Sequence, residues 1–115
     1  MKTKDRAYTS GGLALDKKAK DVLVLELTGL TDLTDFFVLA NGTSERHVRT
    51  VAENIELGMK EKGVPVLSAE GYNDGRWIIL DYGDVIVHVF LESLRELYDL
   101  ENLYLEAKRE ALAES

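Results

Sequence analysis

The apolar positions of this chain fall into short runs of β-branched residues and one long stripe at helical spacing. Two of the short runs, 76–80 and 85–90, are joined by a turn at 81–84 that contains Gly83 and two aspartates. Short apolar runs separated by a few Gly and Asp residues predict a β-hairpin. Neither run alternates with polar residues over its whole length, so we expect the hairpin inside a sheet whose two faces are largely covered.

Two further strands and a helix are predicted upstream of the hairpin. The apolar runs 21–27 and 34–40 are separated by a short turn, which predicts an antiparallel pair. Thr43 or Ser44 then caps a helix. Its core-facing stripe recurs at helical spacing and consists of Val48, Val51, Ala52, Ile55 and Met59. Gly63 ends this helix and 64–68 begins a third strand, so strand, helix and strand predict a right-handed crossover between parallel strands.

The two ends of the chain are more polar than its middle. Residues 1–12 are predicted to be a flexible segment, and 13–20 a short helix. Ser93 and Glu96 form a capping box for a second short helix, and the charged tail 106–115 is expected to fray. The prediction is one α/β domain over 13–105, with a mixed sheet of about five strands in the order β-β-α-β-β-β and helices at both ends. Whether the helices cover one face of the sheet or both stays open.

Composition narrows the class of protein. A chain of 115 residues suits one domain, and the absence of cysteine excludes disulfides and cysteine-ligated metals, which favours the cytosol. No signal peptide is visible, and no apolar run approaches the roughly 20 residues that span a bilayer. Twenty-one acidic against fourteen basic residues give a net charge of −7. This charge argues against sequence-independent binding of nucleic acid. It favours a basic protein partner, or it serves only to keep the protein soluble.

Catalytic and metal-binding patterns are missing from the sequence. The serines at the predicted helix starts lack the Gly-x-Ser-x-Gly setting of a nucleophile elbow. His47 and His88 lie on different predicted elements, without the spacing of a metal site. His88, within a strand, is either a half-buried residue with one hydrogen bond or a functional group paired with Asp81 or Asp84.

An anion site at the start of the long helix is the one enzymatic alternative. Gly42, Thr43 and Ser44 precede a helix whose backbone N–H groups can face a phosphate. The arrangement resembles the glycine-serine loop of nucleotidyltransferases, which is followed by two carboxylates spaced by one residue. The later strand 84–88 contains no Asp-x-Asp, so the paired carboxylates that would hold the metal ions of two-metal phosphoryl transfer are missing. A nucleotide-binding or nucleotidyltransferase-like enzyme remains the alternative hypothesis.

Four blocks of the sequence resemble one family. Residues 35–49, which read DFFVLANGTSERHVR, are similar to the signature of the ribosomal silencing factor (Iojap) family. The blocks 70–77, 81–90 and 98–101 match its other motifs in order, so the resemblance runs from about residue 13 to 104. Two departures concern the edges: Tyr104 stands where the family usually has Trp, and the family's N-terminal helix is usually longer.

The resemblance implies a binding protein without catalytic residues, cofactor or metal. Members of this family bind the large ribosomal subunit through its protein L-fourteen, block its joining to the small subunit and reduce translation when nutrients are scarce. Their fold is similar to that of nucleotidyltransferases without the catalytic carboxylates, and they are often homodimers. The resemblance therefore implies a bacterial cytoplasmic protein that binds neither membranes nor specific nucleic-acid sequences.

Five residues are candidates for the partner-binding surface. Trp77 and Tyr98 are expected as aromatic anchors, because large rings with a polar tip are favoured at interfaces. Glu70, Asp81 and Asp99 are expected to meet basic side chains. Core packing is the alternative for the aromatic residues, while turn chemistry for Asp81 and a helix cap for Asp99 explain those carboxylates equally well.

Overall fold

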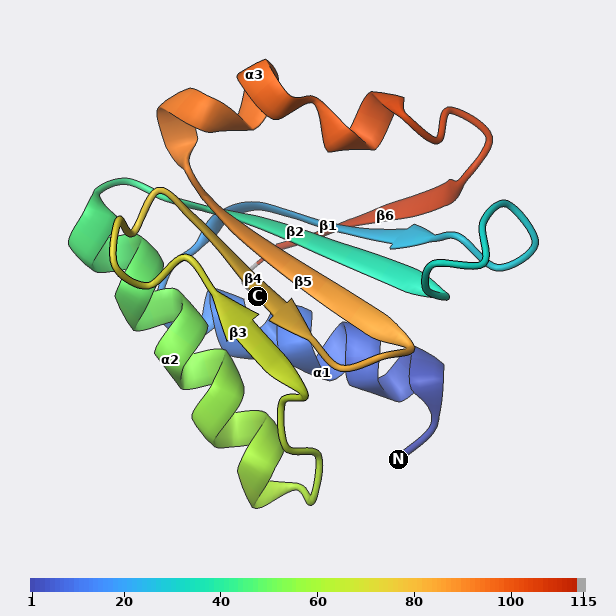
Figure 1. Cartoon of the computed structure of the whole chain (residues 1–115), viewed down its shortest axis with the longest axis horizontal. Coiled ribbons are helices and arrows are strands. Elements are labelled where there is room, and N and C mark those ends of the chain that lie inside the picture. Colours follow the sequence, from blue (N-terminus) through green and yellow to red (C-terminus); the bar gives the residue numbers. More distant parts are fainter. Residues whose placement is uncertain (114–115) are drawn as a thin grey trace.

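The structure, a computed structural model, describes residues 1–113 and has its two long helices on one side of a six-stranded mixed sheet (Figure 1). The strands are β1 (Lys20–Glu26), β2 (Phe36–Gly42), β3 (Ser68–Glu70), β4 (Trp77–Asp81), β5 (Val85–Leu91) and β6 (Lys108–Leu112). They lie in the order β3-β4-β5-β2-β1-β6. The helices are α1 (Thr3–Leu15), α2 (Glu45–Glu61) and α3 (Arg95–Tyr98), with 3-10 turns η1 (Glu92–Leu94) and η2 (Leu100–Asn102).

The hairpin is confirmed as β4 and β5, which pair antiparallel with Trp77 opposite Phe90 and Asp81 opposite Ile86. On its other side β5 pairs in parallel with β2, and β2 pairs antiparallel with β1, as the short connection predicts. Every residue of β2 is buried, as are six of the seven residues of β5. These two strands are therefore the centre of the sheet.

The third strand differs from its prediction. The third strand is predicted to begin with 64–68, but strand β3 begins only at Ser68 and lies at the sheet edge beside β4. Gly63 has a φ of +82°, and the Val64 N–H donates to the Met59 carbonyl at 2.9 Å, so the residues after α2 complete its C-terminal cap. The pairings make β3 parallel to β2, as predicted, but β4 and β5 lie between them.

The prediction of loose ends is wrong for residues 3–12 and 108–112, while residues 114–115 of the predicted tail lie outside the described residues. Helix α1 begins at Thr3 and runs through Gly11, where a Cβ would lie 2.6 Å from Leu112 Cδ1, so the glycine permits close packing on β6. Residues 108–112 form the sixth strand, β6, which pairs with β1. Its first four residues are exposed, so an edge position explains the charged composition that suggested fraying.

The two faces of the sheet are covered unequally. Helices α1 and α2 lie side by side against one face (Figure 1), where the buried cluster includes Val24, Val38, Val51, Ile55, Leu80 and Val87. Only the segment 92–107 crosses the other face (Figure 1), whose buried residues are Leu25, Leu27, Phe37, Leu39, Ile86, Phe90 and Ala107. The long helices therefore cover one face, and the second face is left to a short segment.

Helix α2 approaches the end of β2 at Gly42, which gives a test of the packing. A Cβ on Gly42 would lie 2.8 Å from the Val48 backbone nitrogen, so Gly42→Ala is expected to lower the free energy of unfolding by about 1–3 kcal/mol. Gly12→Ala, in α1, meets nothing within 4 Å and is the control, with an expected gain of up to about 1 kcal/mol. Urea denaturation measures both, and equal effects of the two variants would contradict the assigned packing.

Candidate functional site

Six aromatic side chains gather on the second face of the sheet, and we call them the aromatic face: Phe37, Trp77, His88, Phe90, Tyr98 and Tyr104. Trp77 and Phe90 are neighbours in the β4–β5 register and stack with their ring centroids 5.1 Å apart. Tyr98 lies over Trp77 at 4.4 Å, and Phe37 meets His88 edge-on at 4.7 Å. Because residues two apart on a strand share a face, the alternation of β4 and β5 supplies half of this cluster, namely Trp77, His88 and Phe90.

His88 is held by tryptophan and not by a carboxylate. Trp77 Nε1 donates to His88 Nδ1 at 3.1 Å, so the neutral ring carries its proton on Nε2. Burial lowers the pKa of His88 from 6.5 to about 4, which keeps the ring neutral near pH 7. The proposed pairing with Asp81 or Asp84 is wrong: Asp81 accepts from the Gly83 N–H, and Asp84 accepts from Thr3 and Arg6.

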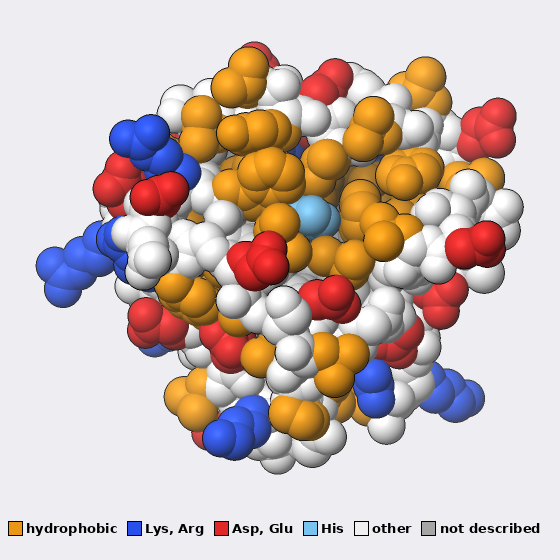
Figure 2. Space-filling view, viewed as in Figure 1, with side chains coloured by type: hydrophobic (Ala, Val, Ile, Leu, Met, Phe, Trp, Pro, Cys, Tyr) orange, Lys and Arg blue, Asp and Glu red, His pale blue; other side chains and the backbone are white. Residues whose placement is uncertain are grey.

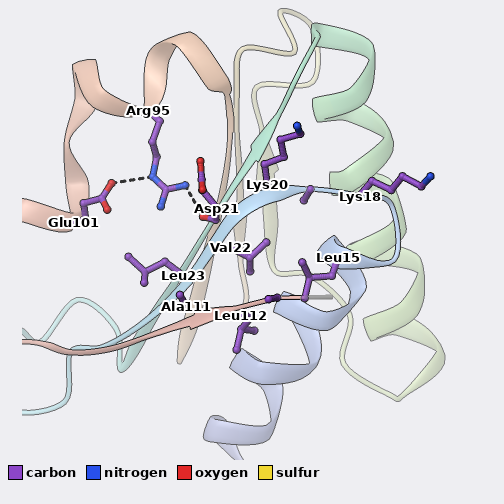
Figure 3. A pocket seen from close by; sticks show the side chains of 12 residues that line it. Leu15, Lys18, Lys20, Asp21, Val22, Leu23, Arg95, Glu101, Ala111 and Leu112 are labelled. Atoms are coloured by element: carbon purple, nitrogen blue, oxygen red, sulfur yellow. Dashed lines mark hydrogen bonds and ion pairs between the residues drawn. The ribbon is translucent and has the colours of Figure 1, made fainter. Parts of the chain in front are cut away.

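Arg95 fastens the segment 92–107 to the sheet. This buried side chain donates through Nε to Glu101 at 3.0 Å, and through Nη1 to Asn41 Oδ1 at 2.7 Å and to the Asp21 carbonyl at 3.0 Å. Figure 3 shows Arg95 reaching toward Asp21 and Glu101 beside an open pocket of about 770 Å³, which is lined by residues of β1, of β6, of the end of α1 and of the segment 92–107. Tyr98 lies three residues after Arg95, so the same contacts hold its ring near Trp77. Sequence reasoning missed Arg95, because a position inside a predicted capping box looks like that of a surface residue. The predicted capping box of Ser93 and Glu96 is wrong: Ser93 lies within η1, and in the described part of the chain neither η1 nor α3 has a side-chain cap.

Four of the five predicted partner-binding residues come together. Glu70 is opposite Ile79 on β4, so Glu70, Trp77 and Asp81 share the second face, and Tyr98 contacts Trp77. Asp99 follows Tyr98 as the C-cap of α3 with a φ of +45°, and it accepts from the Asn102 side chain at 2.7 Å. Figure 2 shows this side of the molecule, where apolar side chains gather and acidic side chains lie beside them. The turn and cap roles considered for Asp81 and Asp99 are therefore present in the structure.

The Gly-Thr-Ser loop is occupied by contacts within the chain. Ser44 is the N-cap of α2, and its Oγ accepts from the His47 N–H at 3.0 Å, so the capping prediction is confirmed for Ser44. The Thr43 N–H donates to His47 Nδ1 at 2.9 Å, which leaves His47 Nε2 to donate to the Lys17 carbonyl at 2.7 Å. Gly42 is required for close packing on Val48. Each residue of the loop thus has a structural explanation.

Arg49 is a second residue that the sequence reasoning misjudged. It falls outside the core-facing stripe of α2, as a solvated residue does, but its Nε and Nη2 donate to the carbonyls of Tyr72 and Asn73, each at 2.7 Å. Glu56, also outside that stripe, accepts from the Tyr72 hydroxyl. The glycines at 71 and 75 were the available signal of an ordered loop, since both have positive φ.

Within residues 1–113 there is no group of three or more His, Asp or Glu side chains placed to hold a metal ion. None of the helices described for this part of the chain is both long and apolar enough to cross a membrane. The second face of the sheet, and not a polar cleft, is therefore the main candidate for function.

Comparisons with known proteins point to one family. The family model described as "Ribosomal silencing factor during starvation" matches residues 2–115. The chain is similar to the ribosomal silencing factors of Halalkalibacterium halodurans and Bacillus subtilis, with 39% and 38% identity over 92 residues. These alignments cover 80% of this chain and 79% and 78% of the two relatives. It is also 30% identical over 95 residues to the mouse protein named "Mitochondrial assembly of ribosomal large subunit protein 1", of which the alignment covers 42%.

Solved structures agree with the sheet described above. A crystal structure of a protein from Chromobacterium violaceum superposes with a TM-score of 0.89 at 32% identity, covering 99% of this chain and 95% of that one. A crystal structure from Bacillus halodurans has a TM-score of 0.76 at 36% identity, covering 84% and 90%. The predicted α/β class with a mixed sheet is confirmed, with six strands in place of about five.

Replacing the Arg95 guanidinium tests whether its hydrogen bonds hold the segment 92–107 on the sheet. Arg95→Met keeps the aliphatic stem but leaves Asn41 Oδ1 and the Asp21 carbonyl without their donor, so the free energy of unfolding should fall by about 2–3 kcal/mol. The fluorescence of Trp77, the sole tryptophan, should also change because Tyr98 loses its support. Arg46→Met, at an exposed position of α2, is the matched control, with an expected change within about 0.5 kcal/mol. Equal free energies of unfolding for the two variants would show that the Arg95 hydrogen bonds contribute nothing to stability.

Proposed function

We propose, from the premise that this chain belongs to the ribosomal silencing factor family, that it binds the large ribosomal subunit through protein L-fourteen and prevents joining with the small subunit. Repression of translation under nutrient limitation in the cytoplasm follows from that block. The observation that carries the proposal is the second face of the sheet. It presents aromatic rings with acidic side chains beside them, and only one short segment crosses it.

The apolar part of this surface supports docking to a protein. Tyr98 is 43% exposed although its ring lies against Trp77, and three leucines of the same segment are 65–74% exposed: Leu97, Leu103 and Leu105. Large side chains held in place before binding lose little conformational entropy on association, and aromatic residues are enriched among the strongest interface contacts. Trp77 and Tyr98 are accordingly the proposed anchors.

The charges beside this surface favour a basic partner. Glu70 and Asp99 are exposed and Asp81 is partly exposed, and the chain as a whole carries a charge of −7. Carboxylates placed around an apolar centre steer a basic protein toward it and select against acidic surfaces. A basic ribosomal protein fits this requirement better than the phosphate backbone of RNA does.

The proposed activity is binding without catalysis. Nucleotide binding at the Gly-Thr-Ser loop has less support, because His47 and Ser44 already satisfy donors of the loop and of the first helical turn. Homodimerisation is part of the same proposal by virtue of the family, and the exposed Leu57 and Leu67, away from the aromatic face, leave apolar surface for a second copy.

Sedimentation with purified ribosomal subunits tests the proposal directly. The protein is expected to pellet with large subunits and to stay in the supernatant with small ones, because the proposed partner is a large-subunit protein. Adding it before the small subunits should also reduce the yield of joined ribosomes in a sucrose gradient. Equal recovery with both subunits, or with neither, would overturn the proposal.

A charge reversal tests the acidic border of the surface. Glu70→Lys is expected to slow association with large subunits several-fold at about 50 mM salt, and by much less at about 500 mM, since exposed charges act through screened attraction. Glu61→Lys makes the same change at an exposed position on α2, against the opposite face of the sheet. Surface plasmon resonance measures the two association rates. If both variants slow association equally, the net charge is responsible and this border is not.

A further inference from the structure

The Nε2 atom of His88 is a buried hydrogen-bond donor without an acceptor. His88 is 5% exposed, and within residues 1–113 its Nε2 has no hydrogen-bond partner. The other ring nitrogen, Nδ1, is occupied by the indole N–H of Trp77 at 3.1 Å. In a neutral imidazole the nitrogen that does not accept carries the proton, so the orphan atom is an N–H group.

A purely structural role does not explain a histidine at this position. The residues two before and two after it on β5, Ile86 and Phe90, are apolar and share its face. An apolar side chain of similar shape would fill the same space, while a buried donor left unsatisfied carries a desolvation cost. Accepting the indole N–H of Trp77 gives a role to Nδ1 of the ring but leaves Nε2 without one. Unsatisfied groups of this kind are rare in folded proteins and often have a functional reason.

The orphan donor lies toward the proposed docking surface. Nε2 is one bond farther from Cβ than Nδ1 is, so it is the ring nitrogen more distant from the strand backbone. The side chain projects from the face that α1 and α2 leave uncovered, and two of its neighbours there, Trp77 and Ile79, are only partly buried. A partner that packs on Trp77 and Ile79 therefore comes within reach of Nε2 after a small displacement of the side chains around it.

The chemistry of the ring selects the acceptor. Burial holds the pKa of His88 near 4, so at neutral pH the ring donates without carrying a charge. A neutral donor in an apolar setting suits a neutral acceptor, because a carboxylate would lose its hydration on entering the same place. Lysine and arginine are donors only, and Nδ1 is already taken, so the cations of a basic partner cannot bond to this ring. A backbone carbonyl oxygen meets these conditions.

We infer that His88 is a partner-binding residue whose Nε2–H donates a hydrogen bond to a backbone carbonyl oxygen of the protein that docks on the aromatic face. The inference rests on the proposed function and adds a requirement of shape to the charge complementarity described above. A partner must place an exposed carbonyl over Trp77 and Ile79, which a basic surface without such a group does not do. The donor thus contributes to specificity, because a partner that supplies the carbonyl gains a buried hydrogen bond that a partner without it does not gain.

Two amide variants separate the ring nitrogens. The amide of His88→Asn occupies the place of Nδ1, so it can keep the contact with Trp77 but has no distal donor. The amide of His88→Gln reaches the place of Nε2 and keeps that donor. In equilibrium binding of the full chain to purified large subunits, the Asn variant is expected to bind about tenfold more weakly, in line with the loss of one buried hydrogen bond. The Gln variant should stay within about threefold of the wild type.

A third variant keeps the test independent of folding. His88→Phe removes both ring nitrogens and retains a ring, so it loses the unsatisfied donor together with the acceptor of the Trp77 indole. It should melt close to the wild-type temperature and still bind about tenfold more weakly. Wild-type affinity in the Phe variant, or equal affinities for the Asn and Gln variants, would overturn the inference while leaving the proposed function in place. A wild-type protein that does not bind large subunits would remove both.

Discussion

The parallel pairing of β2 with β5 is the contact on which the rest of the structure depends. Both strands are apolar on both sides, so they are stable only in the middle of a sheet with material on each face. Between them the chain must return to the same end of the sheet, and α2 with the β3–β4 hairpin makes that return. Helix α1 and strand β6 then come from opposite ends of the sequence and meet at Gly11 and Leu112.

This arrangement leaves the two faces of the sheet with different physical roles. Two helices bury one face against closely packed aliphatic side chains, and the turn before β5 is tied to α1 by Arg6 and Thr3 on Asp84. The other face is covered by a segment without a long helix, which is held at Arg95 by hydrogen bonds to charged and polar groups. A surface built in this way presents rings that are fixed in place and remain partly exposed, which is what a protein-binding site requires.

The local sequence pattern predicts the elements in the middle of the chain correctly but not those at its two ends. The hairpin, the β1–β2 pair and the stripe of α2 follow from periodicity and turn residues, and the alternation of β4 was enough to place Trp77 and Asp81 together. The helix over 3–15 contains two glycines and the strand over 108–112 is mostly charged, so tertiary contacts and not propensity form them. Arg95 and Asn41 are 54 residues apart, and the local sequence around either residue does not predict their hydrogen bond.

His47 and His88 have the same tautomer, but only one of them has an acceptor for its Nε2–H group within the fold. Each ring accepts a hydrogen bond at Nδ1, from the Thr43 N–H in His47 and from the Trp77 indole in His88, so each carries its proton on Nε2. His47 lies in the first turn of α2, where the Lys17 carbonyl is available at 2.7 Å, and its donor ties α2 to the turn after α1. His88 stands in the middle of a sheet, where the backbone carbonyls nearby belong to the strand ladders and the surrounding side chains are mostly apolar. Within residues 1–113 the Nε2 atom of His88 has no acceptor, and under the inference above the docked partner supplies it.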